Sequence, residues 1–186
     1  MLGIIERMRL FVGFLIPESQ KEAIIELQSE IGTLDADCKN VERDNLHLSM
    51  SFLGETAEDD VERIEKDLKE ISLKFKKFDV AISGTRAIPN QRIVRVIALD
   101  VFDDSGVLDR LLEEIRQKIG GDVKPPHLTL CRMKSARGKE RILEFVGKHN
   151  SDSFGKIKIS SIQLIESKLS RSGPVYSVVS GHPFQD

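Results

Sequence analysis

The sequence predicts an α+β fold in which two antiparallel sheets face a central cleft and helices lie outside. Three observations point to this class. Short segments of alternating apolar and polar residues, typical of strands, recur along the 186 residues. Segments with apolar residues at helical spacing separate them. Two of the strand segments also share the pattern histidine-apolar-hydroxyl-apolar, which indicates an internal duplication about a pseudo-two-fold axis.

The first half of the chain predicts strand, helix, strand and helix in that order. Residues 10–16 are an apolar run that is too short to span a bilayer and fits a buried strand. Apolar residues at helical spacing follow Pro17 as far as Gly32. An acidic amphipathic helix is expected over residues 61–71. Between the helices the segment "LHLSMSFL" alternates, with His47, Ser49 and Ser51 on one face and Leu46, Leu48, Met50 and Phe52 on the other.

The second half begins with a hairpin and then repeats the order of helix and strand. Residues 78–88 and 92–102 are two strands joined by the turn "PNQ", and an amphipathic helix over 107–119 ends at two glycines. The segment "HLTLCRM" then alternates, with His127, Thr129 and Cys131 on one face. A short helix near 142–146 and two last strands, within 156–167 and 174–181, complete a single bilobal domain over residues 1–186. Met8 is a second candidate start, so residues 1–7 are interpreted as a candidate extension.

Composition narrows the class of protein without naming a partner. With 40% hydrophobic and 31% charged residues and a formal net charge of -2, disordered and collagen-like chains are excluded. Cys38 and Cys131 are far apart and have no metal-like spacing, which fits a reducing compartment, so we expect a cytoplasmic protein. The chain has no P-loop motif, which disfavours a ligase that uses ATP.

The two tetrads suggest phosphodiester chemistry. In each strand the histidine and the hydroxyl residue point to the same face, because residues two apart do so. If the two strands meet across a cleft, His47 and His127 flank one small volume. One imidazole can then act as base and the other as acid on opposite sides of a phosphorus atom. Ser49 and Thr129 can donate hydrogen bonds to its oxygens. This chemistry requires no metal and no cofactor.

The tetrads with their flanks, "NLHLSMSFLGE" and "PPHLTLCRMK", resemble the motifs of the 2H phosphoesterase superfamily. Within it the chain is most similar to the RNA 2′,3′-cyclic phosphodiesterases, also called 2′-5′ RNA ligases. The resemblance implies opening of a 2′,3′-cyclic phosphate to a 2′-phosphate, and in some members reversible joining of RNA ends. It implies that His47 and His127 are the acid and base, and that Ser49 and Thr129 hold the phosphate. The family commonly has Trp where this chain has Ala98.

Two further residues are candidates for binding the substrate. Arg132 follows the second tetrad, where the family often has an arginine, but strict alternation turns it away from His127 unless the strand bulges. Tyr176 lies in "GPVYS", which resembles the closing segment of the family. Residues 124–148 hold seven Lys or Arg against two acids, so this segment either guides an RNA backbone or is a solvated face. His149 is interpreted as a cation at a helix end, and His182 as part of the tail.

The interpretation leaves alternatives open. The substrate is RNA with cyclic phosphate ends, such as fragments of transfer RNA, or a small cyclic or 2′-5′-linked nucleotide. A protein of a different class, which binds RNA on the same scaffold without catalysis, also fits the pattern. The sequence does not assign which histidine is the acid. We expect a monomer that has no membrane partner.

Overall fold

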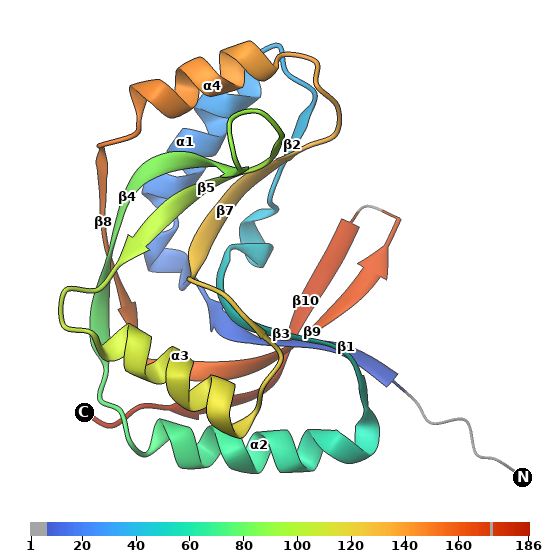
Figure 1. Ribbon diagram of the computed structural model, residues 1–186, viewed down its shortest axis with the longest axis vertical. Coiled ribbons are helices and arrows are strands. Elements are labelled where there is room, and N and C mark those ends of the chain that lie inside the picture. Colours follow the sequence, from blue (N-terminus) through green and yellow to red (C-terminus); the bar gives the residue numbers. More distant parts are fainter. Residues whose placement is uncertain (1–6, 172) are drawn as a thin grey trace, which may run out of the picture.

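Ten strands of the described residues form one strongly curved sheet, and four helices lie against its two halves (Figure 1). The structure is a computed structural model that describes residues 7–171 and 173–186. The main strands are ordered β10-β9-β1-β3-β7-β5-β4-β8, with β2 on β7 and β6 on β3. Every pair of these strands is antiparallel. The predicted α+β class is therefore confirmed.

The elements alternate along the chain much as the sequence patterns predict. The strands are β1 (Arg7–Leu15), β2 (Cys38–Asn40), β3 (His47–Ala57), β4 (Phe78–Pro89), β5 (Val94–Phe102), β6 (Asp122–Val123), β7 (His127–Met133), β8 (Ser153–Ile159), β9 (Ser161–Ser170) and β10 (Gly173–Pro183). The helices are α1 (Glu22–Thr33), α2 (Glu58–Ser72), α3 (Val107–Lys118) and α4 (Lys139–Lys148), with short 3-10 turns at Glu18–Gln20 and Arg43–Asn45. Of the candidate extension, only Arg7 lies within the described residues, where it begins β1 opposite Ala57.

The two predicted sheets are two halves of one sheet that meet at a single point. Strands β10, β9, β1 and β3 form the first half, and β7, β5, β4 and β8 form the second. The ladder between β3 and β7 contains one residue pair, Leu48 with Leu128. Both leucines are fully buried. The two strands that carry the tetrads are thus the ones that connect the halves.

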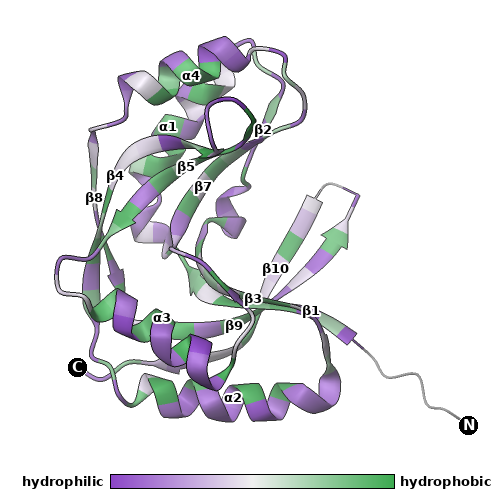
Figure 2. Ribbon diagram, in the orientation of Figure 1, coloured by the Kyte–Doolittle hydropathy of each residue, from purple (hydrophilic) through white to green (hydrophobic). Residues whose placement is uncertain are grey.

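The helices and the core hold the two halves together. The helix that follows β1, α1, packs on β7 of the second half, and α3, which follows β5, packs on β3 of the first half. Helices α2 and α4 contact β9 and β4. Figure 2 shows the hydrophobic stripes of these helices, and apolar residues such as Ile31 of α1 and Leu111 of α3 are fully buried. Each motif strand is therefore supported from behind by a helix of the opposite half.

Two features of the last hundred residues differ from the sequence prediction. The segment 156–167 is not one strand: it divides at Ser160 into β8, which pairs with β4, and β9, which pairs with β1. The chain crosses from one half of the sheet to the other at this point. The alternation of apolar and polar residues does not predict such a crossover, because it is the same in both strands. His182 is also not in a tail, because β10 extends to Pro183 and His182 pairs with Ile162 of β9.

Candidate active site

The pair Leu48–Leu128 brings the two tetrads together on one face of the sheet. Because neighbours along a strand point to opposite faces, His47 and Ser49 lie on the face away from the buried Leu48. His127 and Thr129 flank Leu128 in the same way. Since the strands are antiparallel, His47 lies toward Thr129 and Ser49 toward His127. The four residues expected from the sequence are therefore arranged about one pseudo-two-fold axis.

Both motif strands bulge at the residue after the hydroxyl. In β3, Ser49 pairs with Gly13 and Ser51 pairs with Val12, so that Met50 is an extra residue. In β7, Thr129 pairs with Ala98 and Cys131 pairs with Ile97, so that Leu130 is the extra residue. A bulge shifts the alternation of every side chain that follows it. The fourth position of each tetrad is thus the point where the strand changes phase.

The shifted phase corrects three predicted orientations and reverses a fourth. Ser51, expected on the histidine face, is fully buried and donates to the carbonyl oxygen of Gly120 at 2.7 Å. Cys131, expected beside the histidines, is fully buried in the core. Phe52, expected in the core, is 45% exposed, and its ring lies 5.9 Å from that of Phe11. Arg132 turns to the tetrad face and lines a cavity with His47. Strict alternation turns Arg132 away from His127, and the bulge at Leu130 returns it to the histidine face.

His47 lies in a buried and largely aromatic environment. The residue is 7% exposed, and its ring centre lies 5.1 Å from that of Phe11 and 4.9 Å from that of Tyr176. Its Nδ1 donates to the carbonyl oxygen of Asn45 at 2.7 Å, because a carbonyl can only accept. Burial lowers the pKa of His47 to about 4. The ring is therefore neutral near pH 7, with Nε2 as its unprotonated nitrogen.

His127 lies in a more open and more charged environment. It is half-buried, and its Nδ1 faces the carbonyl oxygen of Pro125 at 3.4 Å, again two residues earlier in the chain. On the neighbouring strand Asp100 pairs with His127, and its carboxylate forms an ion pair with Arg86 at 2.5 Å. Burial lowers the pKa of His127, and the charges of Arg86 and Arg132 act in the same direction. The hydrogen bond to Pro125 and, more weakly, the carboxylate of Asp100 oppose this shift and favour the imidazolium.

A cavity of about 250 Å³ opens beside His47. Its polar lining comprises Lys39, Asn40, Glu42, Asn45, His47, Arg132, Lys134 and Tyr176, and the one acid among them, Glu42, pairs with Lys39 at 2.6 Å. The guanidinium of Arg132 acts on the pKa of both histidines, and the charge of His127 also acts on that of His47. His127 does not line the cavity, but its charge is close enough to act on the His47 ring, which does line it. The cavity suits an anion with an attached ring system.

Two residues at the site carry no motif in the sequence. Asn45 is 6% exposed, donates through Nδ2 to the Pro174 carbonyl at 2.7 Å and accepts at Oδ1 from the Tyr176 amide at 3.3 Å. It therefore fixes β10 and Tyr176 beside His47. Asp100 faces His127 only through the pairing of β5 with β7. For Asn45 the sequence offers one local signal, its position, since Asn45 and Pro125 each lie two residues before a tetrad histidine. For Asp100 it offers none.

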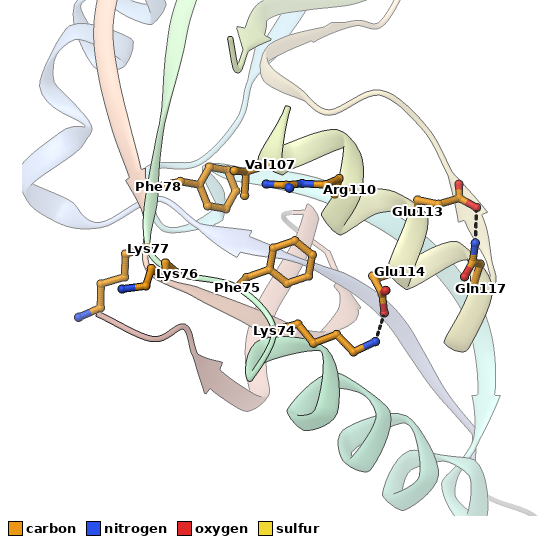
Figure 3. A pocket seen from close by; sticks show the side chains of 10 residues that line it. All are labelled: Lys74, Phe75, Lys76, Lys77, Phe78, Val107, Arg110, Glu113, Glu114 and Gln117. Carbon is orange, nitrogen blue, oxygen red and sulfur yellow. Dashed lines mark hydrogen bonds and ion pairs between the residues drawn. The ribbon is translucent and has the colours of Figure 1, made fainter. Parts of the chain in front are cut away.

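A larger cavity lies away from the tetrads. It has a volume of about 580 Å³ and is bounded by residues 74–78 and by α3 (Figure 3). Lys74 pairs there with Glu114 at 2.6 Å, and Gln117 donates to Glu113 at 2.8 Å. None of the tetrad residues lines it. The volume of a cavity alone therefore does not locate the candidate site.

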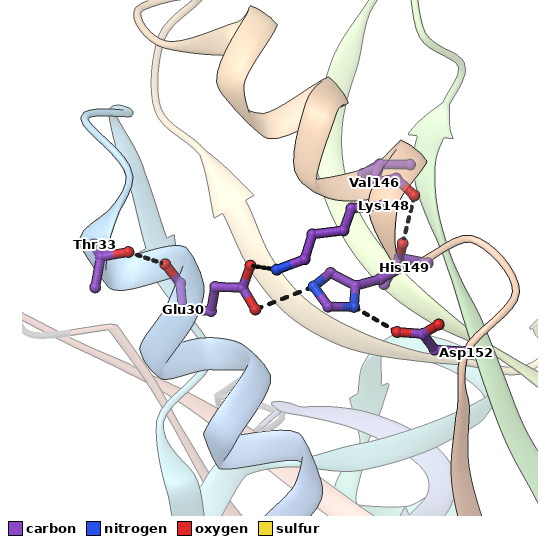
Figure 4. A network of polar contacts seen from close by, with 7 residues as sticks. Glu30, Thr33, Val146, Lys148, His149 and Asp152 are labelled. Atoms are coloured by element: carbon purple, nitrogen blue, oxygen red, sulfur yellow. Dashed lines mark hydrogen bonds and ion pairs between the residues drawn. The ribbon is translucent and has the colours of Figure 1, made fainter.

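His149 also lies outside the site, at the carboxyl end of α4 as expected. Its Nδ1 faces Asp152 at 2.7 Å and its Nε2 faces Glu30 at 3.1 Å, while Lys148 pairs with Glu30 at 2.7 Å (Figure 4). This network ties α1 to α4 and is structural. Within the described residues no group of His, Cys, Asp and Glu side chains is arranged to hold a metal ion. No helix there is long and apolar enough to cross a membrane.

Comparison with known sequences gives consistent relatives. Residues 14–98 match the family described as LigT like Phosphoesterase. A protein of Archaeoglobus fulgidus named RNA 2′,3′-cyclic phosphodiesterase is 33% identical over 176 residues, which cover 91% of this chain and 96% of the relative. A protein of Methanothermobacter thermautotrophicus with the same name is 29% identical over 181 residues, which cover 92% of this chain and 96% of the relative.

Solved structures share the fold. A crystal structure of a Thermus thermophilus protein superposes with a TM-score of 0.81 at 24% identity and covers 95% of this chain and 98% of its own. The crystal structure of Escherichia coli LigT in its apo form superposes with a TM-score of 0.74 at 20% identity and covers 97% and 99%. The curved sheet with its two halves is thus the fold of both proteins.

Proposed function

This chain belongs to the LigT-like phosphoesterase family, and we propose that it opens the 2′,3′-cyclic phosphate at RNA ends by acid–base catalysis with two histidines. The observation that carries the proposal is the pairing of Leu48 with Leu128, since it sets His47 and His127 about one axis on one face of the sheet. The names of relatives that match nearly the whole chain support RNA 2′,3′-cyclic phosphate as the substrate.

In the proposed reaction a water molecule attacks the phosphorus in line with the bond to O3′. The base takes a proton from the water as the new P–O bond forms. The P–O3′ bond breaks, and the acid donates its proton to O3′. The products are a 2′-phosphate and a free 3′-hydroxyl group. Proton exchange with solvent then returns both histidines to their starting states.

We assign His47 as the base and His127 as the acid for hydrolysis. A base must be unprotonated, and burial keeps the pKa of His47 at about 4. The hydrogen bond from Nδ1 to Asn45 leaves Nε2 as the accepting atom. An acid must carry a proton. Burial lowers the pKa of His127 as well, but this ring is only half-buried, and the Pro125 carbonyl and the carboxylate of Asp100 oppose the shift. The two surroundings thus suit opposite roles.

The remaining predicted residues are proposed to hold the phosphate and the nucleoside. Ser49 and Thr129 lie on the histidine face and can donate to the non-bridging oxygens, where negative charge develops. Arg132 carries a positive charge on the same face, and a guanidinium matches a phosphate with two parallel hydrogen bonds. Tyr176 lines the cavity beside His47 and offers an aromatic surface to the terminal base.

The same arrangement accommodates the joining of RNA ends. If the 5′-hydroxyl of a second strand replaces water, His47 takes its proton and the same P–O3′ bond breaks. The product is a 2′-5′ phosphodiester with a free 3′-hydroxyl, and the reaction is reversible because both linkages are phosphodiesters. Supplying an RNA with a 5′-hydroxyl end and looking for a longer, 2′-5′-linked product tests this activity.

The test of the main proposal uses a short RNA with a 2′,3′-cyclic phosphate end in a buffer with EDTA. We expect the wild-type protein to produce a 2′-phosphate. His47→Ala and His127→Ala should each lower kcat by about 10²–10⁴-fold, the usual contribution of a general acid or base. His182→Ala is the matched control, because His182 lies on β10 outside both tetrads.

Three outcomes contradict the proposal. Near-wild-type turnover in either tetrad variant excludes two-histidine catalysis, and loss of turnover in EDTA alone indicates a metal enzyme. Equal RNA binding by all variants with no turnover in the wild type indicates a binding protein on this scaffold. Turnover of cyclic mononucleotides or 2′-5′-linked dinucleotides, with none of RNA ends, identifies a small-nucleotide phosphodiesterase.

A further inference from the structure

A second cavity adjoins the one beside His47. It has a volume of about 330 Å³ and shares Lys134 with the first cavity. Its charged lining comprises Arg92, Arg95, Lys134 and Lys139, and no acidic residue lines it. Ile93, which is 58% exposed, and Met133 add apolar surface. Cations of residues 92–95 and of the basic segment 124–148 thus meet at one place, next to the candidate site.

The cations of this surface differ from their neighbours in the sequence by lacking a carboxylate partner. Among the ion pairs within residues 7–171 and 173–186, Asp35 neutralises Arg137 and Arg141, and acids likewise pair with Arg86, Lys124 and Lys148. None of those pairs includes Arg92, Arg95, Arg132 or Lys134, and all four are exposed. Positive charge is therefore left uncompensated along this surface, whereas the other cations of residues 84–95 and 124–148, except Lys139, are neutralised.

These cations form a line that leads away from the histidines. Arg132, near the end of β7, and Lys134, directly after its last residue, both line the cavity beside His47. In the sheet, Arg132 lies opposite Lys39 of β2 on one side and opposite Val96 of β5 on the other. Beyond Lys134 lies the loop with Arg92, whose carbonyl accepts a hydrogen bond from Lys139 at 2.7 Å. That bond holds the loop against the start of α4.

We propose that this line is a track for the RNA strand on the 5′ side of the terminal nucleotide. The inference rests on the proposed function, and it names a single-stranded oligonucleotide, not a mononucleotide, as the preferred substrate. The terminal nucleotide occupies the cavity beside His47, Lys134 contacts the next phosphate, and Arg92 and Arg95 contact the phosphates before it. The apolar surface of Ile93 and Met133 lies where the bases pass.

The test compares Arg92→Glu/Arg95→Glu with a control of equal charge change, Lys156→Glu/Lys158→Glu, on exposed positions of β8. Binding of a labelled six-nucleotide RNA with a 2′-phosphate end is measured by fluorescence anisotropy over a range of salt concentrations. We expect the track variant to bind at least about tenfold more weakly. Its plot of log affinity against log salt should be shallower by about 0.7 for each phosphate that the variant no longer binds. The control should show neither change in slope nor a comparable loss.

Kinetics then separate this inference from the proposed function. For the track variant we expect kcat/KM to fall about tenfold on the oligonucleotide and to stay unchanged on a cyclic mononucleotide, which does not reach the track. Equal losses on both substrates, or an equal loss in the β8 control, would overturn the track. If the wild type turns over neither substrate while the variant still loses RNA affinity and salt slope, the track stands and the proposed function fails. Thermal unfolding of both variants checks that they fold.

Discussion

The strands β3 and β7 carry the same tetrad and the same bulge, but they lie in opposite surroundings. His47 on β3 is enclosed by Phe11 and Tyr176, whereas His127 on β7 is half-buried beside Asp100 and Arg86. After the bulges, the equivalent positions on the site face are Phe52 in β3 and Arg132 in β7. One half of the site is therefore aromatic and the other is ionic.

This difference teaches how a duplicated motif can serve an asymmetric reaction. The backbone supplies the shared part: two histidines, each with Nδ1 toward the carbonyl two residues earlier, and two hydroxyls. The neighbouring strands supply the part that differs, because β1 and β10 contribute aromatic rings while β4 and β5 contribute charges. Symmetry sets the positions, and the surroundings set the protonation states.

The largest effect is expected from a substrate whose leaving group needs no acid. Replacing O3′ of the cyclic phosphate by sulfur gives a leaving thiolate, which departs without a proton. On the oxygen substrate both His→Ala variants should lose about 10²–10⁴-fold in kcat. On the sulfur substrate we expect His127→Ala to regain most of that loss and His47→Ala to regain none. Rescue of His47→Ala instead would reverse the assigned roles.

The two hydroxyl residues have different partners on the neighbouring strand, glycine beside Ser49 and alanine beside Thr129. Adding a methyl group at the glycine should destabilise the protein more than removing one at the alanine. Gly13 pairs with Ser49 as Ala98 pairs with Thr129, but a Cβ on Gly13 would lie 2.5 Å from the backbone oxygen of Leu48. We expect Gly13→Ala to lower the free energy of unfolding by about 1–3 kcal/mol and to reduce kcat.

Ala98→Gly is the matched variant for this comparison. It creates no clash, and we expect it to lower the free energy of unfolding by only about 1 kcal/mol and to preserve kcat. Urea denaturation and steady-state kinetics measure both quantities. Equal effects of the two substitutions would mean that β1 and β3 can separate freely at this point.

The buried His47 should make the protein sensitive to acid. Its pKa is about 4 in the folded state against 6.5 ordinarily, so between these values the unfolded chain binds a proton that the folded chain does not. Stability is therefore lost as pH falls through this window, by about 2 kcal/mol between pH 7 and pH 5. His47→Gln should remove most of that dependence in urea titrations at the two pH values. A wild-type stability that is unchanged at pH 5 would contradict the buried, neutral state.

The smallest effect is expected at Asp100. Its carboxylate favours protonated His127, so Asp100→Asn should move the alkaline limb of kcat/KM to lower pH. The rate near pH 7.5 should fall by no more than about fivefold, because partly exposed charge pairs contribute about 0.2–1 kcal/mol. The acidic limb, assigned to His47, should stay in place. A shift of both limbs, or an alkaline limb that moves upward, would exclude this role of Asp100.

The sequence was sufficient to predict features that depend on local alternation. The tetrad faces, the hairpin of β4 with β5 and the helices before each motif strand are confirmed, because period and turn residues are local properties. The directions of Ser51, Phe52 and Cys131 were predicted wrongly, since a bulge depends on how a strand pairs with its neighbour. Asp100 was missed for the same reason. The acid–base roles, transfer-RNA substrates, monomeric state and cytoplasmic location stay predictions.

The lone pair between Leu48 and Leu128 also has a mechanical consequence. If the two halves of the molecule rotate relative to each other, the rotation centres on the place where they are joined. His47 and His127 each lie one residue from that pivot, and Tyr176 lies beside His47, whereas Arg92 lies beyond the far end of the ladder between β5 and β7. Such a rotation would move the cations near Arg92 most, while the two imidazoles would keep their spacing.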